Sequence, residues 1–190
     1  MKQRVFDPFR LDVPAFAADA AELDGQWPLT AFPRLAEAGA TDAPDGPHEA
    51  VQWHARGESR GRRAGEPQLW LHLQADTHAW LQCQRCLQPM RQALAVERVF
   101  RFVRTEAEAE AEDPDSEEDV LALSRAFDLR ALVEDELILE LPLVPRHEVC
   151  PDPLPLPQSD TAPDPLQAQA EAAPHPFAKL AVLKRGKSSH

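Results

Sequence analysis

Residues 68–83 alternate between apolar and polar side chains, and this alternation constrains the fold more than any other feature of the chain. One parity is apolar: Leu69, Leu71, Leu73, Ala75, Ala79 and Leu81. The other parity is polar or carries an indole: Trp70, His72, Gln74, Asp76, His78 and Trp80. A period of two over this length predicts a long strand with one face buried in a core.

The neighbouring segments extend this strand into a sheet. The same period continues over residues 94–102, and the intervening CQRCLQP, residues 83–89, predicts a hairpin turn. Short strands are also expected around 51–53 and 120–123. We therefore predict an α+β fold with an antiparallel sheet or a partly open barrel.

Helices are expected on either side of this sheet. Residues 7–40 predict a helical N-terminal segment in pieces, with prolines at first-turn positions. Residues 128–141 predict one further helix, capped by Asp128 and ended by Pro142. The consecutive acids 134–136 point about 100° apart on a helix. They are therefore expected on a solvated face rather than in a paired acid–base site.

Proline and charge divide the chain of 190 residues. Ten of its 19 prolines lie between Pro142 and Pro176. We predict a single domain over 1–150, a Pro/Ala-rich linker over 151–174 and a basic, apolar tail over 175–190.

The net charge of the chain is −12, and nine acidic residues lie between 106 and 119. Without this segment the net charge of the rest of the chain is −3. Such charge density predicts a disordered acidic loop over 105–119.

The acidic balance excludes a protein that coats phosphate backbones, because nonspecific nucleic-acid affinity comes from cationic side chains. Local basic patches remain as candidate contacts with RNA or a protein partner, although each also suits a solubilising turn or chain end. These candidates are Arg56, Arg60, Arg62, Arg63, Lys179, Lys184, Arg185 and Lys187.

Three cysteines without an export signal or a membrane-spanning stretch indicate a cytoplasmic chain with reduced thiols. Cys83 and Cys86 form a C-x2-C pair, and His147 and Cys150 have the spacing of a second ligand pair. A structural zinc site needs four such ligands. The alternative is a pair of reduced thiols that matter only for packing of the turn. Thioredoxin-like redox motifs lie within a βαβ unit, whereas the strands on either side of this pair are expected to be antiparallel. Redox chemistry of that kind is therefore disfavoured.

Motifs of catalysis are scarce, since the chain has no Walker loop, no GxGxxG and no GxSxG elbow. The residues alone therefore indicate a binding or assembly protein.

Three separated strings resemble the signature segments of the YceD family, also known as DUF177. They are CQRCLQPM (83–90), DLRALVEDELILELPLVPRHEVC (128–150) and PHPFAKLAVLKRGK (174–187). The residues that carry the resemblance are Cys83, Arg85, Cys86, Leu132, Val133, Glu134, Asp135, Glu136, Pro142, His147, Cys150, Pro176, Phe177, Leu180, Leu183 and Lys184.

This resemblance implies a non-enzymatic ribosome-biogenesis factor in the synthesis, processing or stability of large-subunit (23S) rRNA. The implied partner is the rRNA precursor or a ribosomal protein. Two alternatives stay open: a zinc-stabilised structural module, and a metal-dependent RNA-processing enzyme. The chain departs from the family pattern by having one cysteine near 150 and His175 where asparagine is usual.

Overall fold

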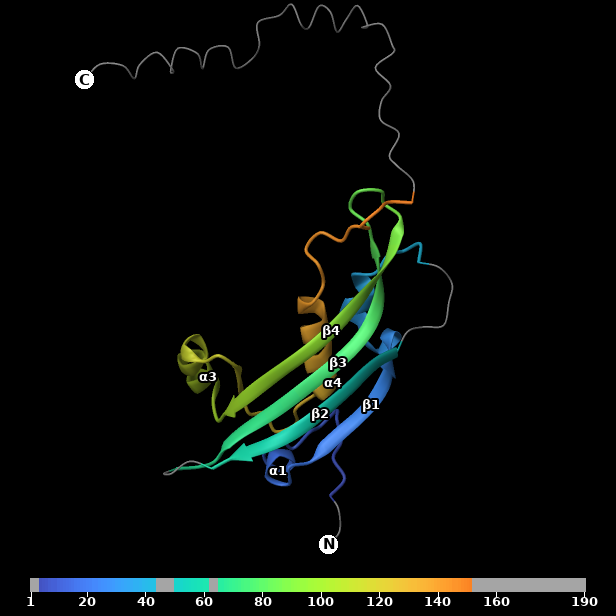
Figure 1. The fold of residues 1–190 in the computed structure, drawn as a ribbon. Helices are drawn as coiled ribbons and strands as arrows, with labels where there is room; N and C mark the ends of the chain where they lie inside the picture. The colour runs from blue at the N-terminus through green and yellow to red at the C-terminus, as the bar shows by residue number, and fades with distance from the viewer. Residues whose placement is uncertain (1–3, 44–49, 62–64, 152–190) are drawn as a thin grey trace, which may run out of the picture. The chain divides into compact units, whose positions relative to one another are not determined.

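The computed structural model describes residues 4–43, 50–61 and 65–151. Their fold is α+β, as predicted, and its centre is one open five-stranded sheet in the order β1-β2-β3-β4-β5 (Figure 1). The first four strands pair antiparallel, whereas β5 joins β4 in parallel. The strands are β1 (Glu22–Pro28), β2 (Ala50–Arg60), β3 (Gln68–Gln82), β4 (Pro89–Val103) and β5 (Asp119–Ala122).

The two long strands create the core face of the sheet. Leu71, Leu73, Ala75, Ala79 and Leu81 of β3 are buried, which confirms the predicted parity. In the β3–β4 register their partners on β4 are mostly apolar, with Arg98 and Gln92 as the exceptions. The hairpin predicted at residues 83–89 joins the two strands. One sheet face is therefore largely apolar across both strands.

Three helices cover this core face: α1 (Val13–Ala18), α2 (Pro33–Glu37) and α4 (Leu129–Leu139) (Figure 1). The predicted helix at 128–141 is confirmed as α4. The Asp128 side chain caps it by accepting hydrogen bonds from the backbone N–H groups of Arg130 and Ala131. The apolar side of α4 enters the core through Leu129, Leu132, Val133 and Leu137.

The expectation of helices throughout residues 7–40 is wrong at residues 22–28. This stretch is strand β1, and its residues alternate between exposed and half-buried along its length. Leu23 and Trp27 pack against the core, whereas Glu22 and Asp24 are exposed. Pairing with β2 then favours the extended backbone over a helix. A short 3₁₀ turn (η1, Leu29–Ala31) links β1 to α2.

The acidic segment predicted as a disordered loop contains regular structure instead. Residues Glu106–Glu112 form helix α3, and Asp113–Asp115 form a 3₁₀ turn, η2. Thr105 and Glu108 make a reciprocal capping box, and acids in the first turn are favourable near the positive end of the helix dipole. Glu112 also forms an ion pair of 2.6 Å with the buried Arg101 of β4. Capping and this pairing offset the repulsion that argued for a loop.

Among the described helices, none is both long and apolar enough to cross a membrane. The predicted linker (151–174) and tail (175–190) lie outside the described residues apart from Pro151, so this division of the chain stays a prediction.

Gly57 of β2 supplies a test of how closely α1 packs on the sheet. A Cβ at this position would lie 2.7 Å from the backbone oxygen of Phe16 and 2.8 Å from its Cδ1 atom. We expect Gly57→Ala to lower the free energy of unfolding by about 1–3 kcal/mol through overpacking. Gly61→Ala is the matched control, because nothing lies within 4 Å of its Cβ position. Urea denaturation of both variants measures the difference, and equal stabilities would contradict this packing.

Candidate metal centre

The turn between β3 and β4, residues 83–88, presents the two thiols of the C-x2-C pair. The Cys83 N–H donates to the Gln88 carbonyl at 3.0 Å, and the Leu87 N–H donates to the Cys83 carbonyl at 2.9 Å. Leu87 adopts a left-handed conformation (φ 62°) and the residue is 63% exposed. These bonds close the chain into a compact turn at the end of the hairpin.

The segment that follows α4, residues 141–151, returns to this turn. The Gln84 N–H donates to the Pro145 carbonyl at 2.8 Å, and the His147 N–H points at the Cys83 sulfur at 3.4 Å. These contacts bring His147 and Cys150 beside the thiols of the turn. Ligand pairs more than 60 residues apart in sequence thus form one cluster.

The four predicted ligands come together with spacings that suit a tetrahedral ion. The ligand atoms of Cys83, Cys86, His147 and Cys150 all lie within 4.8 Å of one another. The sulfurs of Cys83 and Cys150 are 3.9 Å apart, and the Cys86 sulfur is 3.4 Å from Nδ1 of His147. Tetrahedral zinc bonds imply edges of about 3.8 Å between two sulfurs and about 3.5 Å between sulfur and nitrogen. The cluster could therefore hold a metal ion with little rearrangement.

The electrostatics of the turn differ between its two thiols. Burial raises the pKa of Cys83, but hydrogen bonds from the backbone N–H groups of Cys86, His147 and Arg85 outweigh it and lower the pKa to about 5. Burial is also the main cause that raises the pKa of Cys86, with contributions from the neighbouring cysteines. A metal ion that binds here must displace the Cys86 proton, so binding is expected to weaken as the pH falls.

The donor set fits zinc better than a hard cation. Thiolate and imidazole ligands suit Zn²⁺, whereas Mg²⁺ and Ca²⁺ prefer oxygen. Four protein ligands complete a tetrahedron, which is typical of structural sites, since catalytic zinc keeps one position for water or substrate. A bound ion would cross-link the β3–β4 turn to the 141–151 segment.

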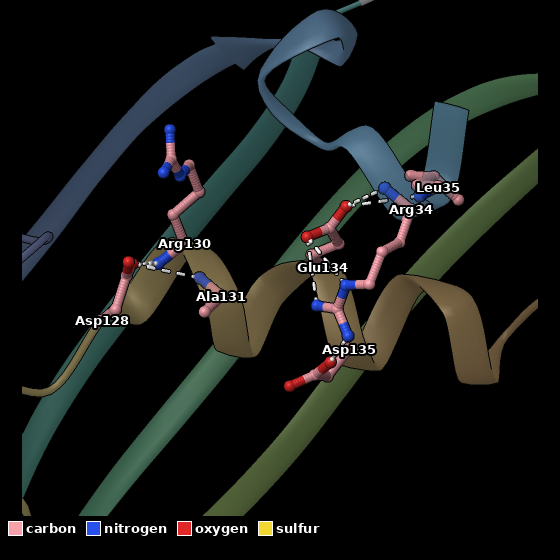
Figure 2. Close-up of polar contacts among 7 residues, drawn as sticks. All are labelled: Arg34, Leu35, Asp128, Arg130, Ala131, Glu134 and Asp135. Atoms are coloured by element: carbon pink, nitrogen blue, oxygen red, sulfur yellow. Dashed lines mark hydrogen bonds and ion pairs between the residues drawn. The ribbon is translucent and has the colours of Figure 1, made fainter. Parts of the chain in front are cut away.

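A second cluster explains most of the acidic string in α4, which was expected to be solvated. That expectation is wrong for Glu134 and Glu136, which are 7% and 6% exposed. Figure 2 shows that Glu134 faces the start of α2, where its carboxylate accepts bonds from the backbone N–H groups of Arg34 (2.8 Å) and Leu35 (3.3 Å). Glu134 therefore supplies the cap that α2 lacks on its own residues.

The Arg34 side chain strengthens this α2–α4 contact. Its guanidinium donates to Glu134 at 3.1 Å and to Asp135 at 2.6 Å (Figure 2). The two acids hold the pKa of Arg34 above its usual value, the Asp135 hydrogen bond being the larger cause. Nothing in the local sequence around Arg34 indicated this partner, which lies about 100 residues further along the chain.

Arg98 of β4 is the partner of Glu136. It lies 3.4 Å from the Glu136 carboxylate and 3.2 Å from that of Glu140. Burial is the main cause that raises the pKa of Glu136, and Arg98 opposes this shift. One signal could have found this contact: Arg98 is a charged residue at a core-parity position of β4, between Val96 and Phe100.

The other predicted residues fall into three groups. Leu132 and Val133 are buried in the core, and Pro142 follows α4 at a half-buried position. Arg56 and Arg60 lie on the sheet face opposite the core, where Arg60 pairs with Glu58 at 2.7 Å and stacks over Trp70. The remaining candidates lie outside the described residues: Arg62, Arg63, Pro176, Phe177, Lys179, Leu180, Leu183, Lys184, Arg185 and Lys187.

Comparison with known proteins accounts for the combination of turn, α4 motif and C-terminal string. The family model described as "Large ribosomal RNA subunit accumulation protein YceD" matches residues 71–184. The chain belongs to the YceD family.

A relative from Haemophilus influenzae bears the same name, Large ribosomal RNA subunit accumulation protein YceD. It is 36% identical over 107 residues, which cover 55% of this chain and 59% of the relative. The chain thus matches less than two thirds of that protein's length. No solved structure matches this YceD-family chain.

We expect the Cys83, Cys86, His147 and Cys150 cluster to bind metal stoichiometrically. Metal-free protein titrated with Zn²⁺ or Co²⁺ under reducing conditions should bind one equivalent. Cys150→Ser should weaken binding at least tenfold, because a hydroxyl is a poor replacement for a thiolate ligand. Glu148→Gln, two residues away and outside the cluster, is the control and should bind as the wild type does. Absence of stoichiometric metal in the wild-type protein would rule out the centre.

We expect the stability of the protein to depend on the charge of Glu134 at the α2–α4 contact. Glu134→Gln keeps the size of the side chain and an oxygen that can accept from the α2 backbone, but it replaces the oxygen that faces the Arg34 guanidinium with an amide group and so removes the ion pair. We expect it to lower the free energy of unfolding by roughly 1–3 kcal/mol. Asp135→Asn, at a position with a 52% exposed side chain, should cost less than about 1 kcal/mol. Equal losses in thermal or urea unfolding would be inconsistent with a stabilising buried ion pair between Glu134 and Arg34.

Proposed function

We propose that this protein promotes the accumulation of large-subunit ribosomal RNA by binding, not by catalysis. Membership of the YceD family is the observation that carries this proposal, because the family and the Haemophilus influenzae relative are both named for that role. The matched region includes the β3–β4 turn and α4, which hold the two polar clusters of the domain.

The coordination chemistry of the cluster supports a non-enzymatic role. Three thiols and one imidazole complete a tetrahedral set of ligands, so a bound ion would have no open coordination position for water or substrate. The buried acids of α4 are engaged with Arg34 and Arg98 and with the backbone of α2. A zinc-stabilised binding module is therefore better supported than the alternative of a metal-dependent RNA-processing enzyme.

The charges of the described domain favour a ribosomal protein over naked precursor RNA as the direct partner. Many arginines are already paired with carboxylates, which reduces their capacity to bind phosphate: Arg34, Arg60, Arg98, Arg101 and Arg104. The sheet face opposite the core also exposes Glu22, Asp24, Asp76 and Glu97. Ribosomal RNA would be repelled by these carboxylates, whereas a basic protein would be attracted to them.

The cytoplasm is the compartment that we propose for this activity. Ribosome assembly requires contact with newly made rRNA, and the three cysteines are free thiols as the metal centre requires.

Depletion of the protein in its own organism tests this function. We expect large-subunit rRNA to fall relative to small-subunit rRNA on a denaturing gel, and re-expression of the wild-type chain to restore the ratio. The Gly61→Ala chain should restore it equally and serves as a control for expression. An unchanged ratio after depletion would contradict the proposal, and cleavage of precursor rRNA by the purified, metal-loaded protein would overturn its non-enzymatic part.

Crosslinking in the same cells distinguishes the two partner classes. Recovery of a basic ribosomal protein by chemical crosslinking, insensitive to ribonuclease, is the expected result. Ultraviolet crosslinks to precursor rRNA without a protein partner would instead identify RNA as the direct contact.

A further inference from the structure

Arg85 lies between the two cysteines of the turn, yet its side chain contacts the other segment of the metal centre. Its Nε donates to the Cys150 sulfur at 3.0 Å. Its Nη2 donates to the His147 carbonyl at 2.8 Å and approaches the Glu148 carbonyl at 3.3 Å. One guanidinium thus joins the β3–β4 turn to three residues of the 141–151 segment.

The shape of the guanidinium explains why it can make these bonds together. Its donors form a rigid planar fork, so bonds to a sulfur and to a carbonyl fix the two acceptors relative to each other. The acceptors here belong to both ligands that come from the 141–151 segment, His147 through its backbone and Cys150 through its sulfur. A lysine ammonium at the same position is a point charge and cannot fix the two acceptors relative to each other.

The charge of Arg85 matters as much as its shape. Three thiolates and a divalent ion leave a net charge of −1, which a single guanidinium neutralises. The neighbouring sulfurs also raise the pKa of Arg85, the Cys150 hydrogen bond being the largest cause. Arg146 carries the same charge in the same segment, but it is exposed and no contact of its side chain is seen among the described residues.

We propose that Arg85 is the positioning residue of the metal centre. It holds residues 147–150 against the turn before an ion arrives, and it neutralises the Cys₃His site once an ion is bound. This inference rests on the metal centre proposed above. Arg85 does not bind the ion itself. Its role is to orient the ligands, as hydrogen-bonded partners of metal ligands do in other sites.

Competition titrations with Co²⁺ and Zn²⁺ on the full chain test the loaded state. Arg85→Gln should weaken metal affinity about 10- to 100-fold while keeping the cobalt spectrum of a tetrahedral thiolate site, because all four ligands remain. Arg85→Lys should recover part of the affinity through its charge, but not all of it. Arg146→Gln is the matched control for charge and should bind as the wild type does.

Hydrogen exchange of the metal-free chain tests the positioning step without an ion. Backbone amides of residues 146–150 should exchange several-fold faster in Arg85→Gln than in the wild type, and Arg146→Gln should leave them unchanged. Circular dichroism checks that each variant folds, which the exposure of Arg85 leads us to expect.

The two measurements separate this proposal from the metal centre itself. If the wild type binds one ion and Arg85→Gln binds it equally well, the role of Arg85 is overturned and the centre stands. If the wild type binds no ion, the centre falls and the metal-related role of Arg85 falls with it, whereas exchange still decides whether Arg85 holds the segment. Equal exchange in Arg85→Gln and wild type would overturn that holding role.

Discussion

The pairing of β3 with β4 is the contact on which the rest of the domain depends. It runs in continuous register from Leu69–Phe102 to Gln82–Pro89. Because side chains alternate faces, a slip of one residue would turn the apolar set of the shifted strand toward solvent. The register therefore determines which face receives α1, α2 and α4. It also places the cysteine turn at one end of the hairpin, within reach of the chain that leaves α4.

Charged side chains form the links between these elements. Glu134 and Glu136 are buried, and each is matched by an arginine from a different element: Arg34 at the start of α2 and Arg98 in β4. A buried carboxylate without such a partner would be costly, so α4 can adopt this rotation only with both arginines in place. The acidic string thereby orients α4, and α4 in turn directs residues 141–151 toward the cysteine turn.

Several features could be predicted from local pattern. The alternation of β3 and the cap at Asp128 follow from the spacing of side chains and from backbone chemistry. Strand β1 was missed because its short alternation is interrupted by Gly25, whose place on the core face is taken by the Trp53 ring. Helix α3 was missed because composition alone weighs repulsion between acids but not the capping box or the Arg101 partner.

The sequence by itself determined the faces of the long strands, the position of α4 and the four residues that are chemically able to bind zinc. These are local properties, which depend on residue type and on spacing over a few positions. Only the tertiary structure decided that His147 and Cys150 meet the cysteine turn, that Arg85 reaches across to them, and that two acids of α4 are buried. The physical reason is that each of these contacts joins residues about 40 to 100 positions apart, and their approach depends on how the helices pack on the sheet.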